Sequence, residues 1–145
     1  MARFFQLDEA GDTLPELRAI LTRLRDQRGE LIRLRDEVLE QQAAVEAGGA
    51  ASQAGRGSEE SVDAAELRRV RLRMQGVIDQ MQAGVARIDE LGITLRDIES
   101  GLVDFPALVN GRQVWLCWRL GEDDVGFWHE LSTGFGSRRP LVELE

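Results

Sequence analysis

A run of apolar residues in the middle of the chain recurs with the alternating three- and four-residue spacing of a helix that packs along one face. Its members are Leu67, Val70, Met74, Val77, Met81, Gly84, Ile88 and Leu91. Gly92 followed by Ile93 is typical of a helix that ends on a left-handed glycine, the Schellman arrangement. The candidate caps and first-turn acids are Ser58, Glu59, Glu60 and Asp63. The pattern therefore predicts a helix from Ser58 to about Leu91.

A second helical segment comes earlier in the chain, from Thr13 to about Ala47. Its apolar residues return every seven positions, at Leu17, Leu24, Leu31, Val38 and Val45. Thr13 with Glu16 fits a capping box, in which each side chain accepts a hydrogen bond from a free backbone N–H. Pro15 then falls in the first turn, where a missing N–H costs nothing. These signals predict that the helix begins at Thr13.

The segment Gly48–Ser58, rich in glycine and small polar residues, separates the two helices. A connection of this kind predicts a flexible loop and an antiparallel helical hairpin. Each helix would be ~45 to 50 Å long at ~1.5 Å per residue, so a small sheet cannot cover the whole apolar stripe. We therefore expect a homo-oligomer, a dimer in which two hairpins form a four-helix bundle.

Composition narrows the functional classes. The 145 residues predict one domain, residues 1–145, and carry a net charge of −8, with arginine as the only strongly basic residue. One cysteine and one histidine cannot build a four-ligand zinc site or a disulfide within one chain. The acidic balance argues against nucleic acid as a partner, and no apolar run is long enough to cross a membrane. The amino terminus has no apolar segment of the secretory type, so we expect a cytoplasmic protein.

The C-terminal third, residues 93–145, predicts strands and turns. Asn110-Gly111 is a strong hairpin signal because both residues tolerate positive φ. It separates the expected strands Leu102–Val109 and Arg112–Leu120, and a turn at residues 121–124 precedes a third, Val125–Leu131. Pro106 cannot donate to a ladder, which favours an edge position for the first strand. The expected fold class is α+β: the helical hairpin of residues 13–91 with a three-strand antiparallel meander.

The turns also predict which side chains share a face of the sheet. If Val109 faces Arg112 and Leu120 faces Val125, alternation sorts the side chains into two sets. The first, almost wholly apolar, is Val103, Phe105, Ala107, Val109, Val114, Leu116, Trp118, Leu120, Val125, Phe127, His129 and Leu131. The second, mixed in character, is Leu102, Asp104, Pro106, Leu108, Gln113, Trp115, Cys117, Arg119, Trp128 and Glu130. We expect the first face to pack on the helices.

Several blocks of this sequence resemble one known family. They are the opening Phe5, Leu7, Glu9 and Ala10, a proline in the first helical turn, and the C-terminal WRLGE, WHEL and GFGSRRP blocks. Together they resemble the uncharacterised prokaryotic family called domain of unknown function 2203. Gly11 departs from the asparagine expected there. The resemblance implies an α+β fold and no mechanism.

His129 is the first candidate for chemistry, since histidine titrates near neutrality. An HExxH zinc motif does not apply, because His129 and Glu130 lie in a predicted strand and point to opposite faces. The expected register also puts His129 and Cys117 on opposite faces, so no metal ligands are predicted. A half-buried histidine with satisfied nitrogens is the alternative to a catalytic one.

The charged residues of the sheet form a second candidate site, either a structural clamp or an anion site. They are Asp104, Arg119, Glu122, Glu130, Arg138 and Arg139. The function remains unknown from sequence. The first hypothesis is a non-enzymatic binding or assembly module that self-associates through the hairpin, or presents Trp115 and Trp128, or Arg138 and Arg139, to a protein or phosphate partner. The alternative is a small-molecule or metal-dependent enzyme of unknown cofactor, with His129, Glu130, Asp104, Arg119 and Glu122 as its catalytic candidates.

Overall fold

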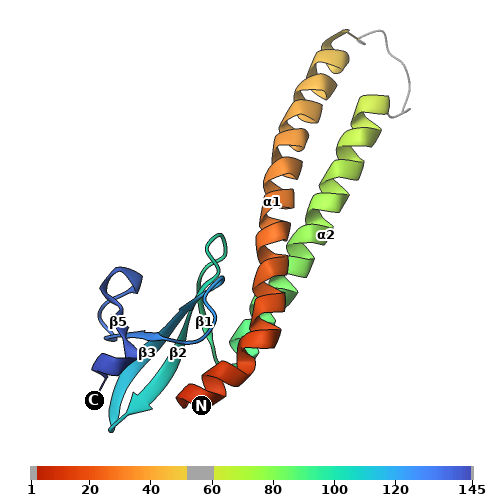
Figure 1. Cartoon of the computed structure of the whole chain (residues 1–145). Helices are drawn as coiled ribbons and strands as arrows, with labels where there is room; N and C mark the ends of the chain where they lie inside the picture. Colours follow the sequence, from red (N-terminus) through yellow and green to blue (C-terminus); the bar gives the residue numbers. More distant parts are fainter. Residues whose placement is uncertain (1–2, 52–60, 145) are drawn as a thin grey trace. The chain divides into compact units, whose positions relative to one another are not determined.

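The computed structural model describes residues 3–51 and 61–144 (Figure 1). Two helices, α1 (Leu7–Ala51) and α2 (Val62–Glu90), precede one antiparallel sheet. The strands are β1 (Thr94–Asp97), β2 (Leu102–Val109), β3 (Arg112–Arg119), β4 (Phe127–His129) and β5 (Arg139–Pro140). The fold is α+β as predicted, with five strands instead of three.

Two compact units make up the chain. The sheet unit consists of Met1–Asp26 with Gln82–Glu145, and the hairpin unit consists of Gln27–Met81. The boundary therefore cuts across both helices. That the 145 residues behave as one domain stays a prediction.

Helix α1 begins at Leu7, so the predicted start at Thr13 is wrong. Glu9 accepts a hydrogen bond from the backbone N–H of Gln6 at 3.1 Å, the reach of an N3 glutamate back to the N-cap. The Thr13 hydroxyl instead donates to the Ala10 carbonyl, 2.7 Å away, inside the helix. The Thr13 signal failed because a better-placed acid, Glu9, lies four residues upstream of Thr13.

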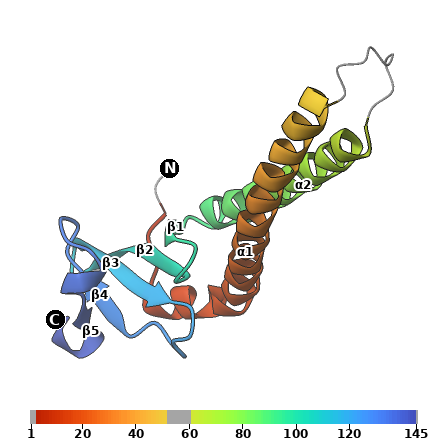
Figure 2. The same ribbon diagram turned by 90° about the horizontal axis from the view of Figure 1, so that it is seen from above.

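Pro15 therefore lies inside α1. A proline in a helix has no N–H to give to the carbonyl four residues earlier, here that of Gly11, and its ring bends the helix. The first turns of α1, drawn in red, run at an angle to the turns that directly follow them (Figure 1 and Figure 2). The bend is the physical consequence of continuing the helix through this residue.

The ends of α2 follow local rules. Ser61 caps the first turn, with its hydroxyl oxygen 3.0 Å from the Ala64 N–H; the predicted caps Ser58, Glu59 and Glu60 lie outside the described residues. At the other end Gly92 has φ +82°, the Ile93 N–H donates to the Ile88 carbonyl and the Gly92 N–H to the Asp89 carbonyl. This is the predicted Schellman arrangement, now confirmed.

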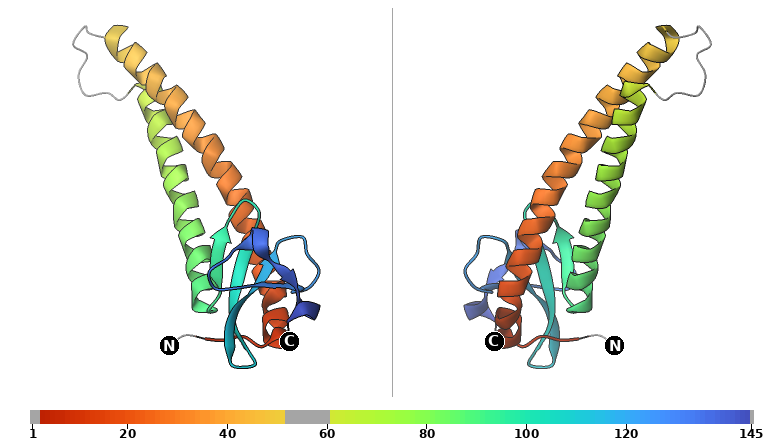
Figure 3. Two further views of the ribbon diagram at one scale, coloured as in Figure 1. Left: turned by 90° about the vertical axis from the view of Figure 1, so that its left-hand side faces the viewer. Right: turned by 90° about the vertical axis from the view of Figure 1, so that its right-hand side faces the viewer.

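The hairpin unit has an apolar seam of its own. The two helices run side by side in both views of Figure 3. Leu34, Val70 and Val77 are buried between them, and the partly buried residues packed against these are Leu31, Val38, Met74 and Met81. Helix α1 continues to Ala51, so the first residues of the predicted loop are helical. Residues 52–60 of that loop lie outside the described part of the chain.

The sheet is a meander in the order β1-β2-β3-β4-β5. The predicted pairing of β2 with β3 is confirmed, with Val109 opposite Arg112 and Asp104 opposite Cys117. The prediction that Leu102–Val109 forms an edge strand is wrong, because β1 pairs with its first half. Pro106 lies beyond that pairing, where its carbonyl accepts a hydrogen bond from the Phe5 N–H at 2.7 Å. Proline is tolerated at this position because the contact with Phe5 uses the Pro106 carbonyl and needs no N–H from Pro106.

One face of β2 and β3 carries the core of the sheet unit, as predicted. We call it the apolar face; its buried members are Val103, Phe105, Ala107, Val114, Leu116 and Trp118. Phe5 packs edge-on against Phe105 with ring centroids 5.1 Å apart, and the Arg18 guanidinium of α1 lies 5.7 Å from the Trp118 ring centroid. The first turns of α1 therefore cover this face. Neither α1 nor α2, over the residues described, has a stretch apolar and long enough to span a bilayer.

Candidate functional site

The pairing of β3 with β4 decides which residues meet, and the predicted register is wrong by one residue. Cys117 faces Phe127 and Trp115 faces His129, whereas the sequence turn predicted Leu120 opposite Val125. A shift of one residue moves every side chain of a strand to the other face. His129 therefore lies on the same face as Cys117, and Trp128 lies on the apolar face.

The cause of the shift is the connection between the two strands, which spans residues 120–126. Leu120 leaves the β3–β4 ladder and donates its N–H to the Gly101 carbonyl at 2.9 Å. Gly101 has φ +69°, and a Cβ there would lie 2.5 Å from the Leu120 Cβ, so only glycine allows this approach. The Trp118 indole N–H then donates to the Glu122 carbonyl at 3.2 Å. These contacts hold Leu120 away from Val125.

Three potential metal donors meet on the face opposite the apolar one. Asp104 of β2, Cys117 of β3 and His129 of β4 offer one oxygen, one sulfur and one nitrogen, all within 4.8 Å of one another. All three are buried, with 3%, 0% and 2% of their surface exposed. We call them the donor cluster. The prediction that His129 and Cys117 are separated by the sheet is wrong.

His129 uses both ring nitrogens. Nε2 lies 3.0 Å from Asp104 Oδ2, and Nδ1 lies 2.8 Å from the Glu130 carbonyl oxygen. A backbone carbonyl on one nitrogen is the contact that orients histidine ligands in metal sites, leaving the other nitrogen for the ion. Because Nε2 contacts Asp104, neither nitrogen faces Cys117, and these three residues do not form a nucleophile–histidine–acid relay.

Arg96, which sequence reasoning missed, completes the surroundings of Asp104. Its Nε donates to Asp104 Oδ2 at 2.9 Å, and its guanidinium lies 4.9 Å from the Trp115 ring centroid. Asp104 Oδ1, in contrast, is buried and has no hydrogen-bond partner among the described residues. A buried carboxylate oxygen without a partner is uncommon and costly. Oδ1 is therefore a carboxylate oxygen in the cluster that a bound ion could use.

Cys117 is held as a neutral thiol in the metal-free protein. Burial raises the pKa of the thiol from 9.0 to about 11, the Asp104 carboxylate adds to the rise, and Arg138 opposes it. Arg138 donates to Glu122 through both of its terminal nitrogens, at 3.0 and 2.9 Å. Its guanidinium also lies 3.9 Å from the Phe127 ring centroid. The Arg138–Glu122 pair thus closes one side of the donor cluster.

The other predicted site residues do not join the cluster. Arg119 is exposed and lies 5.1 Å from the Phe135 ring centroid. Glu130 forms an ion pair with Arg112 and contributes only its carbonyl oxygen to His129.

The two tryptophans, predicted to share one accessible face, lie on opposite faces of the sheet. Trp128 is 2% exposed, with Arg112 and Arg139 near its ring at 5.4 and 5.7 Å. Trp115 is half-buried. A flat, accessible Trp115/Trp128 surface is therefore absent from the described sheet.

The donor set suits a borderline-soft divalent ion. Thiolate, imidazole and carboxylate are the ligands of zinc, at about 2.3, 2.0 and 2.0–2.2 Å from the ion. Donors around a tetrahedral zinc ion lie about 4 Å apart or less at these bond lengths, so small side-chain movements close the 4.8 Å span. Thiolate and carboxylate would together balance the double positive charge.

The fold and the cluster define an α+β protein with a buried site of three mixed donors on adjacent strands. The chain belongs to the family described as "Uncharacterized conserved protein (DUF2203)", whose model matches residues 3–141. This confirms the family resemblance of the sequence blocks. No curated protein and no solved structure matches the chain.

Proposed function

We propose that this chain is a non-enzymatic metal-binding module that holds one zinc-type ion in the donor cluster. The observation that carries the proposal is the convergence of Asp104, Cys117 and His129 from three neighbouring strands within 4.8 Å. The unpartnered Asp104 Oδ1 supports it, because a bound ion would satisfy that oxygen. A reducing compartment such as the cytoplasm suits this role, since Cys117 must remain a free thiol.

A structural ion fits the surroundings better than a catalytic one. Catalytic zinc sites keep one position open to water, whereas structural sites are closed by protein donors. The three ligands are at most 3% exposed, and Asp104 can supply both of its oxygens. The ion would join β2, β3 and β4 and so stabilise the centre of the sheet.

The competing explanation is a clamp without metal, in which Asp104 is held by its ion pair with Arg96 and its hydrogen bond with His129. Titrating metal-free protein with Co²⁺ separates the two. We expect one ion per chain, with a sulfur-to-cobalt charge-transfer band and displacement by Zn²⁺. Cys117→Ser should remove the band and weaken binding by at least about 100-fold.

Glu130→Gln is the matched control for that experiment. Glu130 follows His129 directly but pairs with Arg112, so its variant should bind Co²⁺ like the original chain. No saturable cobalt binding, or equal binding by Cys117→Ser, would reject the metal proposal. If azide changes the visible spectrum of the Co²⁺ form, the ion has an open position and the enzymatic alternative replaces the structural one.

A second proposal concerns the hairpin unit, which we propose to associate with a second copy of itself. Leu39 and Leu72 are 59% and 67% exposed there, and the seam residues Leu31 and Met81 are only partly buried. Exposed aliphatic groups on a helical hairpin favour bundle formation. Analytical sedimentation should give a dimer at micromolar concentration, and Leu39→Glu with Leu72→Glu should give a monomer. A monomer for the original chain would refute this proposal.

A further inference from the structure

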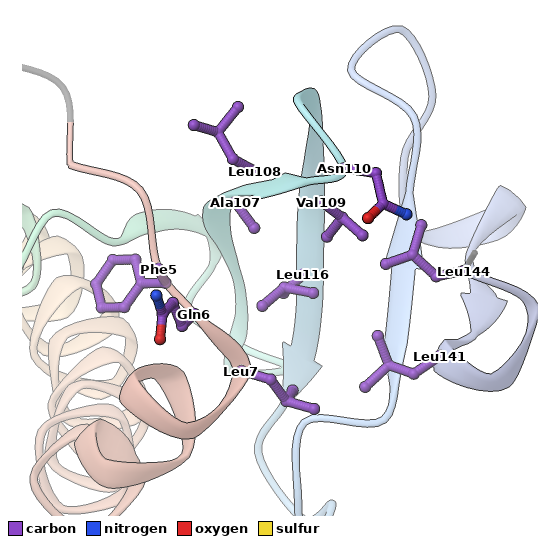
Figure 4. Close-up of a pocket in the computed structure, with 10 residues that line it drawn as sticks. All are labelled: Phe5, Gln6, Leu7, Ala107, Leu108, Val109, Asn110, Leu116, Leu141 and Leu144. Atoms are coloured by element: carbon purple, nitrogen blue, oxygen red, sulfur yellow. The ribbon is translucent and has the colours of Figure 1, made fainter.

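The sheet unit contains an apolar pocket that is separate from the donor cluster. It has a volume of about 400 Å³ and opens on the apolar face of the sheet. Leu116 of β3 and Val109 of β2 form its floor, and Leu141 and Leu144, at the C-terminal 3-10 helix Leu141–Glu143, reach toward them from the other side (Figure 4). The pocket therefore lies beside the part of the face that α1 covers.

The character of the lining limits what could bind. Every lining side chain is aliphatic or aromatic except the carboxamides of Gln6 and Asn110, and none is charged. Two leucines of the lining, Leu7 and Leu108, are 50% and 48% exposed, so the apolar surface continues to the rim. A volume of this size, mostly apolar with a few polar groups, is typical of a small-molecule site.

A charged ligand does not fit this lining. No arginine lines the pocket to neutralise a carboxylate, and a net charge of −8 works against anions in general. No carboxylate lines it either, so an ammonium group would lose its hydration without a partner. A carboxamide can donate to or accept from an uncharged alcohol or amide.

We propose that this pocket binds a small neutral molecule with an aliphatic chain and one uncharged hydrogen-bonding head group, an alcohol or an amide. The chain would lie against Leu116, Leu141 and Leu144, and the head would face Asn110 or Gln6. Binding needs no metal, because Leu116 and Cys117 are neighbours in β3 and point to opposite faces of the sheet.

Titration of the full chain with 1-octanol, octanamide and octanoate, followed by leucine methyl NMR, tests the proposal. We expect the two neutral probes to saturate one site and shift the methyl signals of Leu116, Leu141 and Leu144. Octanoate should bind at least about tenfold more weakly. Leu144→Gln should weaken octanol binding by about tenfold, the loss expected for one buried aliphatic side chain.

Val142→Gln is the control, because Val142 lies in the short helix that Leu144 follows, is 85% exposed and does not line the pocket. It should leave octanol binding unchanged. The proposal is overturned if octanol binding does not saturate, if Leu144→Gln binds octanol as well as Val142→Gln does, or if octanoate binds as tightly as octanol. Leu144 is only partly buried, so its variant should fold, which a circular dichroism spectrum checks.

Discussion

Asp104 is a buried carboxylate with two side-chain partners, Arg96 and His129. Its Oδ2 accepts from Arg96 and faces His129 Nε2. Removing the carboxylate charge takes the anion from Arg96, whose side chain is 42% exposed, and changes the partner of the buried His129 Nε2. We expect Asp104→Asn to destabilise the metal-free protein by about 3 kcal/mol, measured by urea unfolding.

Asp36→Asn provides the comparison, since the Asp36 side chain is 64% exposed and forms its ion pair with its neighbour Arg35. The variant should change stability by less than about 0.5 kcal/mol. If the two substitutions change the unfolding free energy equally, the interactions of Asp104 with Arg96 and His129 do not stabilise the fold.

Cys117 should make the metal-free protein less stable at alkaline pH. The folded pKa of about 11 exceeds the ordinary 9.0, so the folded state keeps a proton that the unfolded state releases. The contribution of Cys117 to the free energy of unfolding is fully present below pH 9 and is lost as the pH rises toward 11. Cys117→Ala should lack this part of the decline in unfolding free energy.

The thiolate can be followed directly by its ultraviolet absorbance. The chain has one cysteine and no tyrosine, so phenolate absorption does not interfere. Absorbance that rises with a midpoint near pH 9 in the folded, metal-free protein would contradict the burial of the thiol.

At the level of elements, two glycines associated with α2 should respond in opposite ways to alanine. Gly92 has φ +82°, and a Cβ there would lie 3.2 Å from the Arg3 side chain, so Gly92→Ala should destabilise by about 1–2 kcal/mol. Gly76 lies in the exposed middle of α2 with no atom within 4 Å of an added Cβ. Gly76→Ala should therefore stabilise by about 0.5–1 kcal/mol. Thermal unfolding of both variants checks the pair, and the same sign for both would refute the assignment.

Local signals predicted some elements correctly and failed at others. The Schellman end at Gly92 and the Asn110-Gly111 turn depend on neighbouring residues, and both are confirmed. The β3–β4 register depends on Leu120 packing on Gly101, a contact between residues distant in the chain. The start of α1 failed for a different reason, because a favourable capping sequence at Thr13 competed with an earlier one at Glu9.

For the whole molecule, the two-unit organisation predicts where zinc would act. A ligand that binds only the folded state stabilises it by RT ln(1 + [L]/Kd), about 2.7 kcal/mol at 100 times Kd. Because the donor cluster belongs to the sheet unit, added Zn²⁺ should slow hydrogen exchange in β2, β3 and β4. Exchange in the hairpin unit, Gln27–Met81, should stay the same, and uniform slowing across both units would contradict the prediction.

The sequence identified individual residues of the candidate site but not their arrangement in space. Asp104 and His129 were identified as candidates from residue type alone, and Cys117 was considered and set aside. Their convergence could not be predicted, because it requires the correct pairing of three strands. Arg96 was missed because β1 is a strand of four residues with no periodic signal.

The seven-residue connection between β3 and β4 has an evolutionary consequence. Leu120, held on Gly101, and the ladder pairs of Cys117 and Trp115 set the position of His129, so residues could be added near Asp123 without disturbing the three donors. The two-residue turn at Asn110-Gly111 has no such freedom, since one inserted residue there would turn Cys117 away from Asp104. We therefore expect related chains to differ in length at the first connection and to keep the length of the second.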